Sequence, residues 1–376
     1  MSKLKTLFRY PAVWLFGLFL AGFAAADLLK PVAVFSDFEN RYLKQLPKPT
    51  VQTVFDGSFA QNYESYLNDQ FILRNNWISL KSHAESALLK VENNGIVYGS
   101  GGQMFEKYPS YSAAQLEKNL DFLSTFLDAN PGATLTIIPS AYEIYPEKLP
   151  IGLKQVNQKE IVDEIYQKYS DKVETLDLYP VLTAGKDGEI YYRTDHHWTT
   201  NGAYLAYLAY CAAKDLTPVD LSKLGVHLVS DFYGTYFNKC KNTTISPDTL
   251  AWYDIPMESV TVDGEGKENY LDELALASRD KYGAFLWGNH GVTILKGQEN
   301  LDASSETTRL LLIKDSYANC FAPFLTYNYD EIWIVDLRSF PKGMTDLVRA
   351  NDFTDILFLY NFVNFSSDTN FYRLNY

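Results

Sequence analysis

The stretch Leu310-Leu311-Leu312-Ile313-Lys314-Asp315-Ser316 is a short apolar run that ends in two charged residues and a serine. A run of this length and composition predicts a strand that is buried on both faces, as strands of parallel sheets are. Two similar runs follow at 332–337 and 356–360, and helical patterns lie between them around 317–325 and 344–349. Strand and helix therefore alternate as the units of a parallel sheet require.

The same alternation precedes this stretch in the chain. A capping box at Ser112 opens a helix with an apolar face up to residue 127, and a strand at 133–138, a helix at 159–169 and a strand at 173–178 follow. Residues 59–91 predict two helices, and residues 96–105 predict a hairpin around a glycine-rich turn. We therefore predict an α/β protein with a parallel sheet, flanking helices and an inserted lobe at about 218–279, where polar and turn residues are frequent.

Composition excludes several classes of protein. The 376 residues are 47% hydrophobic and 21% charged, which is typical of a globular chain with one large domain or two smaller ones. The net charge of −13, without a Lys/Arg stripe, repels phosphate backbones and excludes nucleic acid as a favoured partner. The three cysteines lack a C-x-x-C spacing, so neither a disulfide framework nor a cysteine zinc site is expected.

The N-terminus predicts export. Lys3, Lys5 and Arg9 precede an uncharged run at 10–26, which is just long enough to span a bilayer, and positive charge before a span stays in the cytoplasm. We expect a cytoplasmic segment at 1–9, a transmembrane anchor at 10–30, a tether at 31–58 and an extracellular catalytic domain at 59–376. A cleaved signal peptide is the alternative, because 24–26 is Ala-Ala-Ala, but apolar residues continue beyond Asp27 and favour the anchor.

A second motif, Thr194-Asp195-His196-His197-Trp198-Thr199, carries the candidate chemistry. Serine becomes a nucleophile when a histidine takes its proton and a carboxylate orients that histidine. Asp195 and His197 lie on the same side of an extended segment, whereas His196 points elsewhere. We therefore expect Ser316, His197 and Asp195 to form a triad, with Ser316 at the carboxyl end of a strand and before a helix whose free N–H groups could face an oxyanion.

Simpler interpretations stay open. A serine at the start of a helix is commonly an N-cap, and the polar motif could merely close the entrance of the helix that Thr199 and Thr200 cap. Asp195, His196 and His197 could instead bind zinc with a distant ligand, but consecutive histidines rarely meet one ion. We expect no metal and no bound cofactor.

The motif at 194–199 resembles the signature of the DHHW protein family, which is similar to the SGNH-hydrolase-like proteins AlgX and AlgJ of alginate O-acetylation. Supporting stretches are 39–41, 68–74, 138–150, Gly234-Thr235 and Asp315-Ser316-Tyr317. The resemblance implies a flavodoxin-like, SGNH-type sheet and a triad of Ser316, His197 and Asp195. Lys314-Asp315-Ser316 replaces the usual Gly-Asp-Ser of SGNH hydrolases, so the details of the oxyanion site are not carried over.

Five further residues are candidates for binding substrate or an oxyanion. They are Trp198, Tyr317, Asn289, Arg338 and Tyr142. Trp198 could stack on a sugar, although most of the aromatic residues in the chain pack in the core. Asn289 could donate to an oxyanion or occupy a turn, and Arg338 could bind a polar substrate or form an ordinary ion pair.

Together these features favour an exported, membrane-anchored O-acyltransferase, most simply an acetyltransferase, that acts on hydroxyls of an extracellular polysaccharide or cell-wall polymer. The resemblance implies a membrane-bound partner that donates the acyl group. A carbohydrate esterase with the same triad is the second hypothesis. A non-catalytic protein that binds or assembles polysaccharide is the third.

Overall fold

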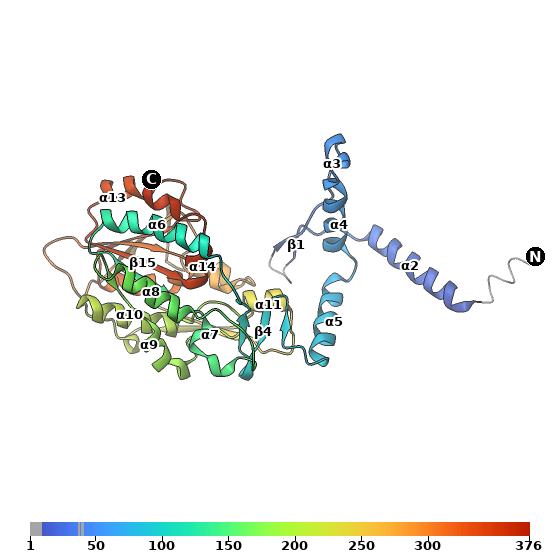
Figure 1. Ribbon diagram of the computed structural model, residues 1–376, viewed down its shortest axis with the longest axis horizontal. Coiled ribbons are helices and arrows are strands. Elements are labelled where there is room, and N and C mark those ends of the chain that lie inside the picture. The colour runs from blue at the N-terminus through green and yellow to red at the C-terminus, as the bar shows by residue number, and fades with distance from the viewer. Residues whose placement is uncertain (1–9, 37, 39–40) are drawn as a thin grey trace, which may run out of the picture. The chain divides into compact units, whose positions relative to one another are not determined.

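The computed structural model describes residues 10–36, 38 and 41–376, and the chain divides into two compact units (Figure 1). The first unit comprises the chain up to Lys90 together with Lys241–Thr243, and the second comprises Val91–Cys240 and Thr244–Tyr376. The predicted cytoplasmic segment at 1–9 lies outside the described residues, as do Glu39 and Asn40 of one stretch that supports the family resemblance.

An eight-stranded mixed sheet forms the centre of the second unit, in the order β11-β10-β12-β14-β13-β15-β6-β7. The five strands from β14 to β7 are parallel, and β12, β10 and β11 continue the sheet in antiparallel pairs. The strand bounds are β6 Thr134–Ile138, β7 Glu174–Thr175, β10 Met257–Val262, β11 Glu265–Lys267, β12 Val292–Gly297, β13 Arg309–Lys314, β14 Glu331–Asp336 and β15 Asp355–Asn361. The middle of β13, from Leu310 to Ile313, is fully buried, as expected for a strand covered on both faces.

The prediction of a parallel sheet was therefore incomplete, because β10, β11 and β12 add an antiparallel edge. Asp263 and Gly264 form the tight turn between β10 and β11, and both have positive φ values, 47° and 87°. Asp-Gly at a two-residue loop is a strong hairpin signal because such turns need left-handed backbone at both positions. β10 and β11 lie within the stretch 218–279, and β12 lies beyond it and joins them to the main sheet through β14.

Helices cover the sheet on both sides. Figure 1 shows α6 (Ala113–Ala129) and α13 (Met344–Ala350) on one side of the sheet, and α8 (Gln158–Tyr169) and α10 (Thr200–Lys214) on the other. These four helices match the predicted positions. The shorter helices are η1 Ser100–Gly102, α7 Ala141–Ile144, η2 Pro146–Lys148, α9 Tyr179–Ala184, η3 Lys186–Gly188, η4 Leu221–Lys223, α11 Thr235–Cys240, α12 Glu273–Leu276, η5 Lys281–Ala284, η6 Ser316–Cys320, η7 Ala322–Tyr327, α14 Phe362–Ser367 and η8 Phe371–Asn375.

Two predicted elements differ from the structure. The helix expected at 317–325 is a pair of 3₁₀ helices, η6 and η7, and Pro323 occupies the first turn of the second. Proline lacks an N–H and clashes with the preceding turn, so a continuous α-helix cannot pass through it. The strand expected at 173–178 shortens to the two residues of β7, and α9 begins soon after it at Tyr179.

Two smaller antiparallel sheets complete the second unit. β3 (Glu92–Asn93), β4 (Ile96–Tyr98) and β5 (Met104–Glu106) form the first, which includes the predicted hairpin. β8 (Val226–Phe232) pairs with β9 (Asp248–Tyr253) in the second.

The first unit contains α2 (Pro11–Leu29), a helix of 19 residues with a mean hydropathy of 2.0, and none of its apolar window is buried. By length and composition α2 can cross a membrane. The remaining elements are β1 Phe35–Ser36, β2 Arg41–Tyr42, α3 Val51–Phe55, α4 Ser58–Gln70 and α5 Arg74–Ala87. The last two helices match the pair predicted at 59–91. Asp69, from the stretch at 68–74, accepts hydrogen bonds from Nη1 of Arg41 at 2.9 Å and from the N–H of Lys44 at 2.8 Å.

Candidate active site

The motif at 194–199 forms the tip of a short hairpin that leads into α10. Tyr191 and Trp198 pair as an antiparallel bridge, and the N–H of Tyr192 donates to the carbonyl of His197 at 3.2 Å. Thr199 then caps α10, because its hydroxyl accepts from the N–H of Gly202 at 3.3 Å. Asp195 and His197 therefore lie on the loop that enters this helix, as the sequence predicted.

Asp248 in β9 anchors the base of this loop. Its Oδ2 accepts from the N–H and the hydroxyl of Thr194 at 2.8 and 2.6 Å, and its Oδ1 accepts from the N–H of Arg193 at 3.1 Å. The hydroxyl of Thr194 accepts in turn from the N–H of Gly234 at 3.1 Å. This network fixes the backbone immediately before Asp195.

Asp195, His197 and Ser316 lie in one chain of hydrogen bonds. Nδ1 of His197 is 2.6 Å from Oδ1 of Asp195, and Nε2 of His197 is 2.7 Å from Oγ of Ser316. The second carboxylate oxygen of Asp195 accepts from the N–H of Thr235 at 2.6 Å. All three side chains are buried, so water competes little for these bonds.

Ser316 follows the carboxyl end of β13, and Asp315 fixes the turn that presents it. The buried carboxylate of Asp315 accepts from the N–H of Tyr317 at 3.0 Å, the N–H of Asn361 at 2.9 Å and Nδ2 of Asn364 at 2.7 Å. Burial raises the pKa of Asp315, although these donors oppose the shift. The N–H of Tyr317, one of the groups at the start of the helix that could face an oxyanion, therefore already donates a hydrogen bond to Asp315. Among the described residues, the N–H of Ser316 itself has no hydrogen-bond partner.

The electrostatics keep Asp195 ionised. Burial alone would raise the pKa of Asp195, but the neighbouring His196 and His197 and the N–H of Thr235 hold it well below its usual range. Burial and the charge of His197 lower the pKa of His196 to about 4, so His196 is neutral at physiological pH. A fixed negative charge therefore lies beside Nδ1 of His197, 2.6 Å from it, where it can orient the ring.

His196 lies beside the triad. The hydroxyl of Tyr317 donates to the carbonyl of His196. The ring centroid of His196 is 3.8 Å from that of His197. Asp195, His196 and His197 offer metal-ligand atoms within 4.8 Å of one another. However, these atoms already have partners. Asp195 accepts from the N–H of Thr235 and pairs with Nδ1 of His197, and Nε2 of His197 pairs with Ser316. Binding an ion would break these hydrogen bonds.

Trp198 is fully buried and does not form an open platform for a sugar ring. Its Nε1 donates to the carbonyl of Tyr317 at 2.8 Å, which ties the Asp-His loop to the backbone directly after Ser316. Tyr317 is also buried, and its ring centroid lies 5.1 Å from that of His197. Both residues therefore pack against the triad.

Asn289 and Arg338 belong to a second polar cluster around the buried Lys314. Nζ of Lys314 donates to Oδ1 of Asn289 at 3.0 Å, to Oδ1 of Asn319 at 2.8 Å and to Oδ2 of Asp336 at 3.2 Å. Arg338 binds both carboxylate oxygens of Asp336, at 2.8 and 2.6 Å. The ion pair expected as one alternative for Arg338 is therefore present.

Tyr142 lies in α7, and its hydroxyl donates to the carbonyl of Val156 at 3.0 Å. Burial and the neighbouring Glu143 raise the pKa of Tyr142 well above its usual range, so it stays neutral. None of its described hydrogen bonds joins it to Asp195, His197 or Ser316.

Sequence reasoning missed Tyr282 of η5. Its ring stacks on the imidazole of His197 with centroids 3.8 Å apart and an interplanar angle of 9°. Its hydroxyl donates to the carbonyl of Ser316 at 3.0 Å. Nothing in the residues around Tyr282 distinguishes it from the other 27 tyrosines of the chain, which has 28.

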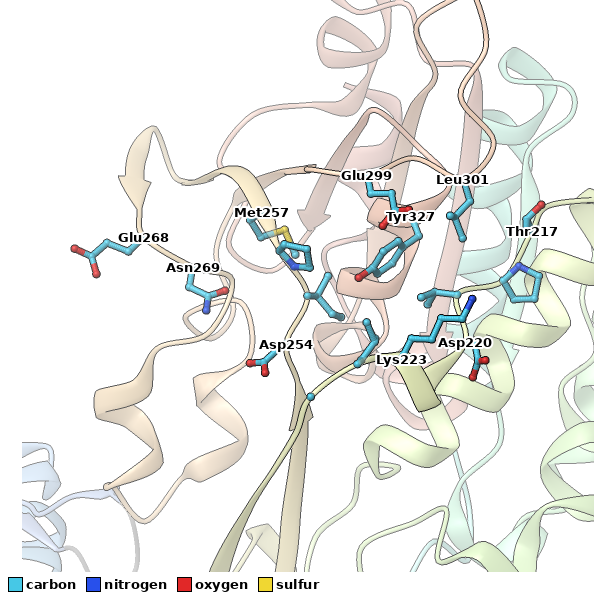
Figure 2. Close-up of a pocket in the computed structure, with 16 residues that line it drawn as sticks. Thr217, Asp220, Lys223, Asp254, Met257, Glu268, Asn269, Glu299, Leu301 and Tyr327 are labelled. Carbon is cyan, nitrogen blue, oxygen red and sulfur yellow. The ribbon is translucent and has the colours of Figure 1, made fainter.

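A cavity of about 740 Å³ in the second unit is lined by other residues (Figure 2). Figure 2 shows side chains from several separate stretches of the second unit around it, among them Lys223, Asp254 and Tyr327. Neither this cavity nor a smaller one of about 370 Å³ beside Tyr192 and Arg193 includes a triad residue in its lining.

Comparisons with known proteins agree with the motif. A family model described as DHHW protein matches residues 83–335. The probable alginate O-acetylase AlgJ of Pseudomonas aeruginosa is 27% identical over 163 residues, which are 40% of this chain and 41% of that one. The chain thus spans about two fifths of the length of the curated relatives that it matches.

Solved structures share the fold of about three quarters of this chain. A DHHW family protein from Eubacterium siraeum has a TM-score of 0.64 and 24% identity, and the match covers 76% of this chain and 96% of that one. Bacillus cereus PatB1, solved with a sulfonyl adduct, has a TM-score of 0.58 and 18% identity, and the match covers 73% of this chain and 96% of that one.

Proposed function

The chain belongs to the DHHW family, and from this premise we propose that it is an exported, membrane-anchored O-acyltransferase with an SGNH-type catalytic domain. It transfers an acyl group, in the first instance acetyl, to hydroxyls of an extracellular polysaccharide or cell-wall polymer. The observation that carries the proposal is the hydrogen-bonded sequence Asp195–His197–Ser316, with distances of 2.6 and 2.7 Å. The partial similarity to AlgJ, named a probable alginate O-acetylase, supports the choice of a sugar hydroxyl as acceptor.

The first half of the reaction forms an acyl-enzyme. Nε2 of His197 takes the proton from the hydroxyl of Ser316 while Oγ attacks the acyl carbonyl carbon, and Asp195 stabilises the imidazolium. The tetrahedral intermediate collapses, and the imidazolium returns its proton to the leaving group of the donor. The unpartnered N–H of Ser316 is the proposed oxyanion donor, and Asn289 remains the side-chain candidate.

The second half passes the acyl group to the acceptor. His197 takes the proton of a sugar hydroxyl, whose oxygen attacks the ester carbonyl on Ser316. The bond to Oγ breaks, and Ser316 recovers its proton from the imidazolium. Water as acceptor would give an esterase by the same steps, so transfer depends on how well the site favours a sugar hydroxyl over water.

The proposed location is supported by α2, which is long and apolar enough to cross a membrane. With the basic residues before α2 on the cytoplasmic side, the catalytic domain would lie outside the cell. Activated acyl thioesters are made in the cytoplasm, so an acyl group must first cross the membrane. A membrane-bound protein that delivers the acyl group is therefore the proposed partner, and the polymer is the second substrate.

The test uses the purified full-length protein with p-nitrophenyl acetate as donor and a neutral oligosaccharide as acceptor. Acetylated sugar and free acetate are both quantified. We expect Ser316→Ala to lose transfer by on the order of 10⁴-fold or more. The matched control is Ser305→Ala, because Ser305 is an exposed serine outside the triad, and we expect it to retain wild-type transfer.

A sulfonyl fluoride provides a second readout, suggested by the sulfonyl adduct in PatB1. Mass spectrometry should find the adduct on Ser316 of the wild-type protein and no adduct on this peptide in Ser316→Ala. Release of acetate without sugar transfer would indicate an esterase. Normal cellular function of Ser316→Ala, with no adduct on the wild type, would indicate a non-catalytic protein.

A further inference from the structure

Tyr282 contacts two members of the triad with two different parts of its side chain. Its ring covers one face of His197, and its hydroxyl donates to the carbonyl of Ser316 at 3.0 Å and of Tyr317 at 3.3 Å. Tyr282 itself is buried, so it cannot leave this position without disturbing its neighbours. One side chain therefore links the orientation of the imidazole to the backbone that carries the nucleophile.

The geometry of the stack is informative. Two neutral aromatic rings repel when they lie face to face, because both faces carry negative charge, and such pairs prefer offset or edge-on arrangements. The rings of Tyr282 and His197 are nearly parallel, at 9°, with centroids only 3.8 Å apart. A cation over the same face is attracted instead, and the attraction is larger where water is excluded. The arrangement thus suits an imidazolium better than a neutral imidazole.

We propose that Tyr282 is a positioning residue whose electron-rich ring stabilises the imidazolium of His197 while its hydroxyl holds the Ser316 turn. The proposal rests on the proposed function, in which His197 becomes an imidazolium in both half-reactions. Tyr282 touches the base and the turn, and it acts on the reaction through them.

Asp195 also stabilises the imidazolium, but substitution of Tyr282 removes none of the other groups around His197. The direct neighbours of His197 besides Tyr282 are Asp195 and His196 from the same loop and Ser316 and Tyr317 from η6. Groups next to Tyr282 or His196 form a second layer: Tyr192, Tyr236, Cys320, Glu106 and Asp315. Burial holds the pKa of Tyr192, Tyr236 and Tyr317 well above the usual range and raises the pKa of Cys320 to about 12, so these four are neutral. Asp195 supplies a charge that substitution of Tyr282 leaves in place.

The experiment is an NMR titration of His197 in the full-length protein with isotope-labelled histidine. The chain has 5 histidines, and the signal missing from His197→Gln assigns the ring. We expect Tyr282→Leu to move the titration midpoint to lower pH by about one unit, because the imidazolium loses its π partner. Tyr282→Phe keeps the ring and should titrate as the wild type does.

Pentafluorophenylalanine at position 282 separates ring electronics from packing. It has nearly the shape of phenylalanine, but fluorination reverses the charge distribution of its face, so it should lower the midpoint as Tyr282→Leu does while the protein stays folded. An unchanged midpoint with pentafluorophenylalanine overturns the proposal. A shift with Tyr282→Phe equal to the shift with leucine also overturns the role of the ring.

The pH dependence of acyl transfer is the second readout. The acidic limb of the rate profile should move with the NMR midpoint in each variant, with a lower kcat for Tyr282→Leu. A protein that transfers no acyl group at all would contradict the proposed function and leave the NMR titration to decide the role of Tyr282 separately.

Discussion

Among single residues, Asp195 carries the clearest link between charge and stability. Its folded-state pKa lies well below the ordinary value of 3.8 because its histidine neighbours and the Thr235 N–H outweigh the effect of burial. The unfolded chain therefore takes up a proton near pH 4 that the folded chain does not. The stabilisation by Asp195 is fully present above this pH and is lost as the pH falls further.

We predict that Asp195→Asn flattens the fall in the free energy of unfolding between about pH 4 and pH 2, relative to the wild type. Urea unfolding at a series of pH values measures this slope. Other carboxylates with lowered pKa values, such as Asp336, are the same in both proteins and cancel in the difference. Equal slopes would contradict the assigned charge state of Asp195.

Gly234 is a second residue of interest, because its lack of a side chain leaves room for the side chain of Asp195. A Cβ at this position would lie 2.2 Å from Cβ of Asp195 and 2.4 Å from its Oδ2. Gly234→Ala should displace the carboxylate from His197, and we predict a loss of acyl transfer on the order of 10²-fold. Gly266→Ala is the matched control, since a Cβ there meets no atom within 4 Å. Full transfer by Gly234→Ala would show that Asp195 tolerates displacement.

Among the elements, β13 and β14 are joined at their carboxyl ends by a buried ion pair. Lys314 and Asp336 are register partners in the parallel ladder, and their side chains are 2% and 0% exposed. Burial lowers the pKa of Lys314, while Asp336 opposes this shift and favours the charged form. The pair therefore fixes the strand ends next to Ser316.

We predict that Asp336→Ala destabilises the second unit by about 3–5 kcal/mol, because it leaves a buried ammonium group without its counter-ion. Asp163→Ala is the control. It removes an exposed i,i+4 pair with Lys159, and pairs of this kind contribute only about 0–1 kcal/mol. Denaturant unfolding of the two variants compares them directly, and equal losses would contradict the electrostatic role of Asp336.

At the scale of the whole molecule, α2 is long and apolar enough to span a membrane, which bears on where the proposed chemistry takes place. We predict that the full-length protein stays in the membrane fraction after carbonate extraction, because about 20 apolar residues suffice to span a bilayer. Its intact mass should include the N-terminal segment. A mass that lacks residues up to the Ala24-Ala25-Ala26 stretch would instead identify a cleaved signal peptide.

The sequence by itself determined the features that depend on near neighbours in the chain. The apolar runs of β13, β14 and β15 and the amphipathic helices α6 and α8 are local patterns, and the structure has them close to the predicted bounds. Asp195 and His197 stand in one motif, and Ser316 follows a strand end. Asp263-Gly264 was an equally local signal for the antiparallel edge that the prediction overlooked.

Only the tertiary structure decided which distant residues surround that motif. Tyr282, Gly234 and Asp248 are separated from Asp195 by tens of residues, and their types are common in turns and cores. No local pattern encodes a ring that stacks on an imidazole or a glycine that makes room for a carboxylate. These contacts arise because packing of the sheet, the hairpin and η5 brings the segments together, and burial then makes each contact strong.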